Sequence, residues 1–230
     1  MLERPMSLPV NPPYVICYTP GKVGSTSVMR TLGTIGVPVH RCEFSNIKQY
    51  HVADYPTITL VRDPIAWLVS GTFEWRLNNN HPLPVPKDAP GFVEWAMNFN
   101  ERLKFYMTWF DAHYSPITGV NVAANWFPKK TGWKIYSIRS LVVRTEWFDS
   151  VFADAVRDFL PMYYPDISFS SFKVLNLAKG TDRFEGYNEF IAALRFPKEW
   201  IQRFYVHHPF CKRYFLGKER MEWVRKWSKR

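Results

Sequence analysis

Tyr14-Val-Ile-Cys-Tyr-Thr19 and the segment after it, Pro20-Gly-Lys-Val-Gly-Ser-Thr-Ser27, are the most informative part of this sequence. The first segment is apolar, β-branched and aromatic, which is typical of a buried strand. After Ser27, apolar residues recur at helical spacing as far as Ile35. A glycine-containing turn between a strand and a helix suits an anion, because backbone N–H groups and the helix N-terminus converge there.

The alternation of strands and helices continues along the chain. A second strand is predicted at Val37–Phe44 and a third at Thr57–Val61. Asp63 is a good N-cap and Pro64 a good first helical residue, so a helix is predicted to begin there. This alternation indicates an α/β fold with a mainly parallel central sheet.

Further elements follow after a polar, proline-rich connection. A long helix is predicted over Phe92–Tyr114, and two short strands at Lys134–Ile138 and Leu141–Val143. Apolar residues from Phe148 to Phe159 recur on one face, which predicts an amphipathic helix.

The chain is interpreted as one domain over residues 1–230, with a flexible segment at residues 1–13 and a basic helix at residues 218–230. Hydrophobic residues make up 47% and charged residues 22%, which excludes wholesale disorder. Apolar runs fall short of the roughly 18 residues that span a bilayer. Residues 1–13 lack the apolar region of a secretory signal.

The net charge indicates which classes of partner the protein binds, and the spacing of its cysteines indicates its cellular compartment. The net charge of +10 favours an anionic partner, such as a nucleotide, a nucleic acid, an anionic lipid or an acidic glycan. Cys17, Cys42 and Cys211 have neither disulfide-framework nor metal-ligand spacing. The sequence therefore predicts no metal site and a reducing compartment, the cytoplasm.

The glycine turn resembles the 5′-phosphosulfate loop of sulfotransferases that use 3′-phosphoadenosine 5′-phosphosulfate (PAPS). In that family the loop reads Pro-Lys-x-Gly-Ser/Thr-Ser/Thr, and Pro20, Lys22, Gly24, Ser25 and Thr26 match it with one extra residue before the lysine. The resemblance implies that the donor's 5′ end is held by Lys22, Val23, Gly24, Ser25, Thr26 and Ser27.

A second signature of the same family is a strand that ends in Arg-Asp-Pro, with a serine eight residues after the arginine. Arg62-Asp63-Pro64 and Ser70 reproduce that spacing, and the resemblance implies that Arg62 and Ser70 hold the 3′-phosphate. A strand end followed by a helix cap is the alternative interpretation of this segment.

Later blocks resemble the capsular-polysaccharide-synthesis sulfotransferases, a carbohydrate sulfotransferase family. These blocks are Trp109-Phe-Asp111, Thr118–Val122, Gly132–Tyr136 and Val143-Arg-Thr-Glu146, with Lys179 at the expected cofactor edge. The resemblance implies a P-loop-NTPase-like three-layer sandwich. The implied reaction moves a sulfuryl group from PAPS to a hydroxyl of a carbohydrate or polysaccharide, leaves adenosine 3′,5′-bisphosphate and requires no metal.

The chemistry of sulfuryl transfer asks for a cation near the leaving oxygen and a base for the acceptor proton. Lys22 is the expected cation, and His40 is the expected base, because relatives place a catalytic histidine on the strand after the loop's helix. Glu43 is the alternative base, and Asp111 and His113 are weaker candidates.

Two other functions remain open on the sequence alone. A nucleotide-dependent phosphotransferase would need a degenerate P-loop, since the lysine precedes Gly24 where a Walker A motif places it after the glycine. A basic nucleic-acid-binding module would fit the charge, but the sequence carries no known nucleic-acid-binding signature.

Overall fold

The structure is a computed structural model that describes residues 12, 14–43, 52–77, 88–98, 101–122, 124–170, 172–175 and 187–228. The chain's internal contacts group it into two compact units, each made of segments that are separated in the sequence. Unit 1 consists of Met1–Val61, Phe110–Asn125 and Thr131–Lys179. Unit 2 consists of Arg62–Trp109, Trp126–Lys130 and Gly180–Arg230.

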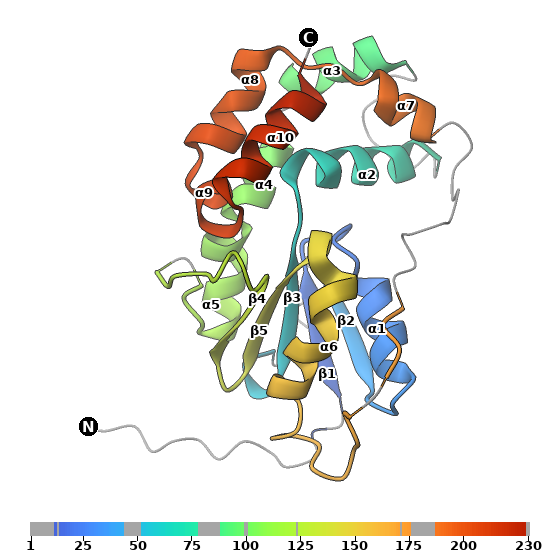
Figure 1. The fold of residues 1–230 in the computed structure, drawn as a ribbon, viewed down its shortest axis with the longest axis vertical. Helices are drawn as coiled ribbons and strands as arrows, with labels where there is room; N and C mark the ends of the chain where they lie inside the picture. The colour runs from blue at the N-terminus through green and yellow to red at the C-terminus, as the bar shows by residue number, and fades with distance from the viewer. Residues whose placement is uncertain are drawn as a thin grey trace. The chain divides into compact units, whose positions relative to one another are not determined.

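Unit 1 is built on a five-stranded sheet in the order β2-β1-β3-β5-β4 (Figure 1). The strands are β1 (Val15–Thr19), β2 (Val39–Glu43), β3 (Thr57–Val61), β4 (Trp133–Ser137) and β5 (Ser140–Arg144). All neighbours are parallel except β4, which pairs antiparallel with β5 at the edge. The predicted α/β class and the mainly parallel sheet are therefore confirmed.

Helices pack on this sheet. They include α1 (Ser25–Gly33), which packs on β1 and β2, and α6 (Phe148–Phe159), which packs on β4 and β5 (Figure 1). The apolar face of α6 is buried, as its sequence pattern predicts. Shorter helical segments are η2 (Val52–Asp54), η3 (Phe110–Tyr114), α5 (Ser115–Thr118) and η4 (Thr145–Trp147).

The topology of the sheet places the end of β1 at a switch point. Strands β1, β3 and β5 are buried along their whole length, as strands of a parallel sheet are. From β1 the chain crosses to β2 on one side, and β3 lies on the other side of β1. In open α/β sheets, ligands bind outside the carboxyl ends of strands where the order reverses in this way.

Unit 2 is helical in the part of the chain that the structure describes (Figure 1). Its elements are α2 (Pro64–Leu77), α3 (Ala89–Asn98), α4 (Glu101–Trp109), α7 (Tyr187–Ala193), α8 (Lys198–Gln202), η5 (Arg203–His207), α9 (Pro209–Tyr214) and α10 (Gly217–Trp227). Among the described residues, none of the helices combines the length and apolar character needed to cross a membrane.

The predicted long helix over residues 92–114 is described as α3, α4 and η3, and residues 99 and 100 lie outside the described residues. Phe110–Tyr114, the end of the predicted helix, forms η3.

Candidate functional site

The loop between β1 and α1 has an unusual backbone. Gly21, Lys22 and Gly24 have φ angles of 79°, 54° and 105°, all in the left-handed region. Lys22 is the only non-glycine residue with positive φ among those that the structure describes. Glycine adopts this region freely, whereas an L-residue pays roughly 1–2 kcal/mol for it. Backbone strain of this kind occurs where a site requires a particular geometry.

The N-terminus of α1 faces the end of this loop. Because the residue before the helix is Gly24, the helix has no side-chain cap, and its first turn contains no acidic residue. Ser25 and Ser27 are buried there, with 6% and 5% of their surfaces exposed. The positive end of the helix dipole is therefore available to an anion, with hydroxyl groups close by.

Residues at the carboxyl ends of β3 and β5 contact the loop between β1 and α1. The Thr145 hydroxyl, just after β5, donates a hydrogen bond to the Val23 carbonyl oxygen at 2.7 Å. A Cβ atom on Gly24 would lie 3.7 Å from the Thr145 Cγ2 and 3.8 Å from the Leu60 Cδ1. Thr145 thus fixes the middle of the loop, a role that the sequence did not reveal although the residue lies in one of the matching blocks.

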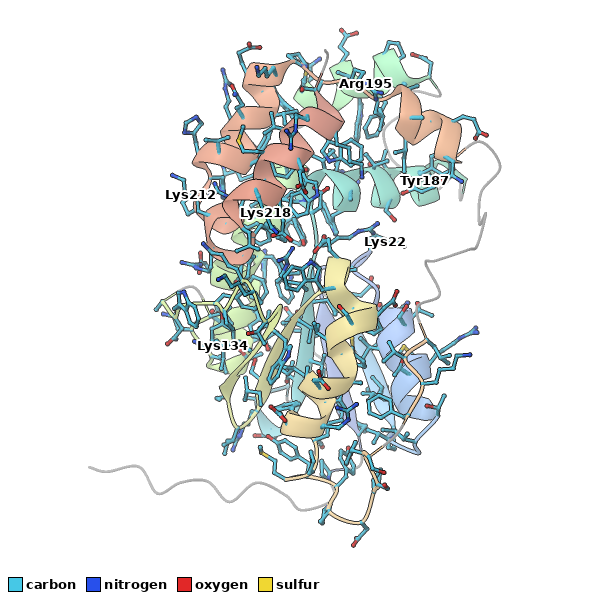
Figure 2. All side chains as sticks on the ribbon, in the orientation of Figure 1. Lys22, Lys134, Tyr187, Arg195, Lys212 and Lys218 are labelled. Atoms are coloured by element: carbon cyan, nitrogen blue, oxygen red, sulfur yellow. The ribbon has the colours of Figure 1, made fainter. Side chains whose placement is uncertain are left out.

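Glu43 lies beside the loop at the carboxyl end of β2. It pairs in register with Thr19, the last residue of β1. A Cβ atom on Gly21 would lie 3.8 Å from the Glu43 carboxylate. The side chain is 41% exposed, and its Oε1 lies 3.7 Å from the Nε of Arg41. The structure therefore brings a partly solvated carboxylate to the same sheet edge as Lys22, which Figure 2 labels.

His40 lies on the same strand but further from the loop. It pairs with Ile16 near the beginning of β1, and its ring lies 5.3 Å from the ring of Tyr14. Three residues along a strand span about 10 Å, and an odd separation places two side chains on opposite faces. The structure thus brings Glu43 to the loop and does not bring His40 there.

Asp111 and His113 belong to η3 in unit 1. Tyr114, the next residue, shares a hydrogen bond with Ser140, which is the first residue of β5. Because β5 runs parallel to β1, this contact fixes the end of η3 at the amino end of the sheet, opposite the loop.

Arg62 opens unit 2 and its backbone is clamped by Tyr106. The Tyr106 hydroxyl accepts a hydrogen bond from the Arg62 N–H at 2.7 Å and donates one to the Arg62 carbonyl oxygen at 2.8 Å. Tyr106 is buried and stacks on Trp67 at 4.6 Å. This clamp joins residues 44 positions apart, so the sequence contained no signal for it.

Arg62 and Ser70 are both partly exposed, Arg62 just before α2 and Ser70 within it. From Val61 to Phe73, all of which are described, only Arg62, Ala66 and Ser70 are not buried. Ala66 and Ser70 are four residues apart within α2 and so lie above one another on that helix, whereas Arg62 precedes it. The three partly exposed side chains are a guanidinium, a methyl group and a hydroxyl.

Asp63 and Pro64 begin α2 as the sequence predicts. The Asp63 Oδ1 accepts a hydrogen bond from the Ile65 N–H at 2.9 Å and another from the Tyr205 hydroxyl. Its Oδ2 accepts from the Trp227 indole N–H at 3.1 Å. Asp63 is 3% exposed, so it acts as a buried helix cap.

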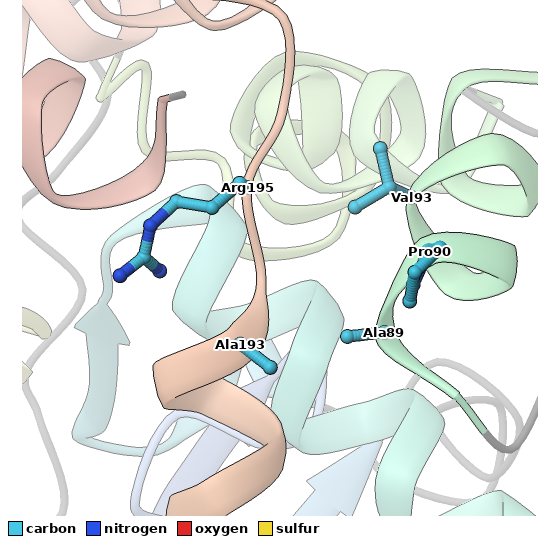
Figure 3. Close-up of a pocket in the computed structure, with 5 residues that line it drawn as sticks. All are labelled: Ala89, Pro90, Val93, Ala193 and Arg195. Atoms are coloured by element: carbon cyan, nitrogen blue, oxygen red, sulfur yellow. The ribbon is translucent and has the colours of Figure 1, made fainter. Parts of the chain in front are cut away.

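A further hollow lies in unit 2, between α3 and the end of α7. It has a volume of about 200 Å³ and is lined by Ala89, Pro90, Val93, Ala193 and Arg195 (Figure 3). The guanidinium of Arg195 points away from the other lining side chains in Figure 3. This hollow contains none of the site residues predicted from the sequence.

Lys179 lies outside the described residues. Within the described ranges, no group of three or more His, Cys, Asp or Glu side chains is arranged to hold a metal ion. The chain matches no family model, no curated protein and no solved structure.

Proposed function

We propose that this chain transfers the sulfuryl group of PAPS to a hydroxyl of an acceptor, a carbohydrate or polysaccharide. The observation that carries this proposal is the backbone of the loop from Pro20 to Gly24, which holds Lys22 in a left-handed conformation before an uncapped helix. Successive backbone N–H groups beside a compact ammonium charge suit a phosphosulfate. We also propose that the fold is a P-loop-like three-layer sandwich. The proposed location of the protein is the cytoplasm.

The loop residues act on the donor. Lys22 neutralises the charge that develops on the bridging oxygen as the bond between sulfur and the 5′-phosphate breaks. The backbone N–H groups from Val23 onward and the hydroxyls of Ser25, Thr26 and Ser27 hold the phosphate. The transfer is in line, as in phosphoryl transfer, and the leaving group departs as adenosine 3′,5′-bisphosphate.

Glu43 is the residue best placed to act on the acceptor. As the acceptor oxygen forms its bond to sulfur, the Glu43 carboxylate takes the hydroxyl proton, so that positive charge does not build up on that oxygen. Its proximity to Gly21 and its partial exposure support this role over His40. Arg62 and Ser70 are the proposed holders of the 3′-phosphate.

Calorimetric titration with adenosine 3′,5′-bisphosphate, AMP and ATP tests the proposal. We expect the bisphosphate to bind more tightly than AMP and to raise the thermal midpoint by stabilising the folded state. Arg62→Ala and Ser70→Ala should weaken the bisphosphate far more than AMP. Equal binding of AMP and the bisphosphate would exclude a 3′-phosphate site, and preferential, magnesium-dependent binding of ATP would favour a phosphotransferase.

A further inference from the structure

The hydrogen bond from Thr145 sets the orientation of one peptide group in the loop between β1 and α1. The Thr145 hydroxyl donates to the Val23 carbonyl oxygen at 2.7 Å. The described peptide bonds are all trans. In a planar trans peptide the carbonyl oxygen and the following N–H point in opposite directions. The Gly24 N–H therefore points away from Thr145.

This N–H belongs to a run of backbone donors in the loop. Four successive N–H groups have no hydrogen-bond acceptor among the described residues, those of Val23, Gly24, Ser25 and Thr26. The Gly24 carbonyl oxygen, in contrast, accepts a bond from the Ser27 N–H at 2.9 Å and so belongs to the start of α1. Successive N–H groups of this kind form an anion-binding concavity when they point to the same side.

The peptide between Val23 and Gly24 needs a support to keep this orientation. Gly24 has a φ angle of 105°, and glycine passes between backbone regions at little cost, so its preceding peptide can turn over. A turned peptide would present the Val23 carbonyl oxygen in place of the Gly24 N–H. A carbonyl oxygen repels a phosphate, whereas an N–H binds it. The bond from Thr145 opposes that rotation.

Thr145 is itself held by its neighbours. The Arg144 N–H donates to the Gly132 carbonyl oxygen at 2.8 Å, and the buried Arg144 guanidinium carbon lies 4.6 Å from the centre of the Trp147 ring. That ring packs on Gly132, where a Cβ atom would lie 2.8 Å from the Trp147 Cε3. A support that is fixed by its own contacts holds a binding group more precisely than a mobile side chain does.

We infer that Thr145 is a positioning residue of the loop. Its hydroxyl holds the peptide between Val23 and Gly24 so that the Gly24 N–H donates to a phosphate group of the ligand. Thr145 acts through the loop backbone and is not a catalytic residue. This inference rests on the part of the proposed function that places a phosphate in the loop, and it adds the residue that keeps the loop in its binding conformation.

Amide NMR spectra of the isotopically labelled full chain, titrated with inorganic pyrophosphate, test the inference. We expect the Gly24 amide proton to shift downfield as pyrophosphate binds, because it forms a hydrogen bond to a charged oxygen. Thr145→Val keeps the methyl group, whose carbon lies 3.7 Å from the Cβ position of Gly24, but removes the hydroxyl. This variant should lose the shift and bind pyrophosphate about tenfold more weakly, as expected for one hydrogen bond to a charged group. Thr145→Ser keeps the hydroxyl and should bind as the original chain does.

Thr34→Val is the matched control. The Thr34 hydroxyl also donates to a backbone carbonyl oxygen at 2.7 Å, that of Thr31, but at the opposite end of α1. If Thr145 only stabilised the fold, both valine variants would lower the thermal midpoint and keep their affinity for pyrophosphate. Unchanged affinity in Thr145→Val would therefore overturn the inference, as would equal weakening in Thr34→Val.

Two further outcomes would also overturn it, and they hold even if Thr145→Val fails to fold. One is a Gly24 amide proton that does not respond to pyrophosphate in the original chain, and the other is a tenfold loss of affinity in Thr145→Ser.

The same titration with adenosine 3′,5′-bisphosphate separates this inference from the proposed function. Binding of pyrophosphate with the Gly24 shift, but no binding of the bisphosphate, would refute the proposed donor and support the role of Thr145. Equally tight binding of the bisphosphate by Thr145→Val and the original chain would support the donor and refute that role. Circular dichroism spectra unchanged from the original chain would show that the variants fold.

Discussion

Lys22 has a left-handed backbone conformation that a residue with a side chain disfavours. The effect of Lys22 on stability can therefore be measured apart from its proposed effect on the reaction. Replacing Lys22 by glycine removes the left-handed strain at φ 54°. We expect Lys22→Gly to leave the free energy of unfolding unchanged or to raise it by up to about 1 kcal/mol. Turnover of PAPS should fall about a hundredfold or more, since a preorganised charge is lost.

Urea unfolding and a sulfuryl-transfer assay measure the two effects of Lys22→Gly independently. Lys22→Ala is the control, because it also removes the charge but keeps the strained backbone. A glycine variant with normal turnover would show that the loop needs only its backbone N–H groups, and that Lys22 has no part in the reaction.

Substitutions of Glu43 and of His40 should have opposite effects on turnover. Glu43→Gln keeps the size and polarity of the side chain but cannot accept the acceptor proton, so turnover should fall by about 10² to 10⁴. The affinity for adenosine 3′,5′-bisphosphate should change little, because the base faces the acceptor. His40→Ala should keep turnover, since His40 packs on Tyr14 at the other end of the strand. Loss of turnover in His40→Ala with an active Glu43→Gln would reverse the assignment.

At the scale of single elements, α9 depends on a histidine in its neutral form. The Nδ1 of His208 accepts a hydrogen bond from the Phe210 N–H at 3.2 Å and caps the helix. Burial lowers the pKa of His208 below its ordinary value of 6.5. As the pH falls through that value, the unfolded chain takes up a proton more readily than the folded chain, so stability falls with it.

His208→Asn isolates this effect, because asparagine caps a helix but does not titrate. Urea unfolding of the original chain should show a loss of stability between about pH 7 and about pH 5, and the variant should lose less over that window. Identical pH profiles for the two proteins would show that the cap does not respond to protonation.

The elements also show how far the sequence alone could lead. β3 and α6 coincide with their predicted bounds, because each is a marked apolar pattern between strong stop signals. The strand containing Glu43 was predicted as well, but which of its residues reaches the loop depends on the register with β1. That register is a pairing between distant segments, so the sequence favoured His40, whereas the register places Glu43 beside the loop.

Contacts between distant segments explain the other differences between the site predicted from the sequence and the site in the structure. Thr145 supports Val23 across 122 residues, and Tyr106 clamps Arg62 across 44. Neither side chain differs in type or local pattern from an ordinary core or helix residue. The glycine-containing loop between a strand and a helix could therefore be predicted from the sequence, whereas the residues that hold it in place could not.

At the scale of the molecule, unit 2 is assembled from three separated segments, and Asp63 joins the first to the last. Its carboxylate accepts hydrogen bonds from Tyr205 and from Trp227, which lie 142 and 164 residues away. Because Asp63 follows Arg62 directly and caps α2, the same contacts also fix the start of the helix that carries Ser70.

Removing the carboxylate should therefore destabilise the whole unit. We expect Asp63→Ala to lower the free energy of unfolding by about 3 kcal/mol or more, since two buried donors lose a charged acceptor. Tyr205→Phe should cost less, about 1.5–3 kcal/mol for one hydrogen bond to a charged group. The double variant Asp63→Ala/Tyr205→Phe should be no less stable than Asp63→Ala, because the two residues act through one contact.

Tyr163→Phe is the control: this hydroxyl is buried without a hydrogen-bond partner among the described residues, so its removal should cost little. Urea unfolding measures all four variants, and additive losses for Asp63 and Tyr205 would show that they stabilise the fold independently.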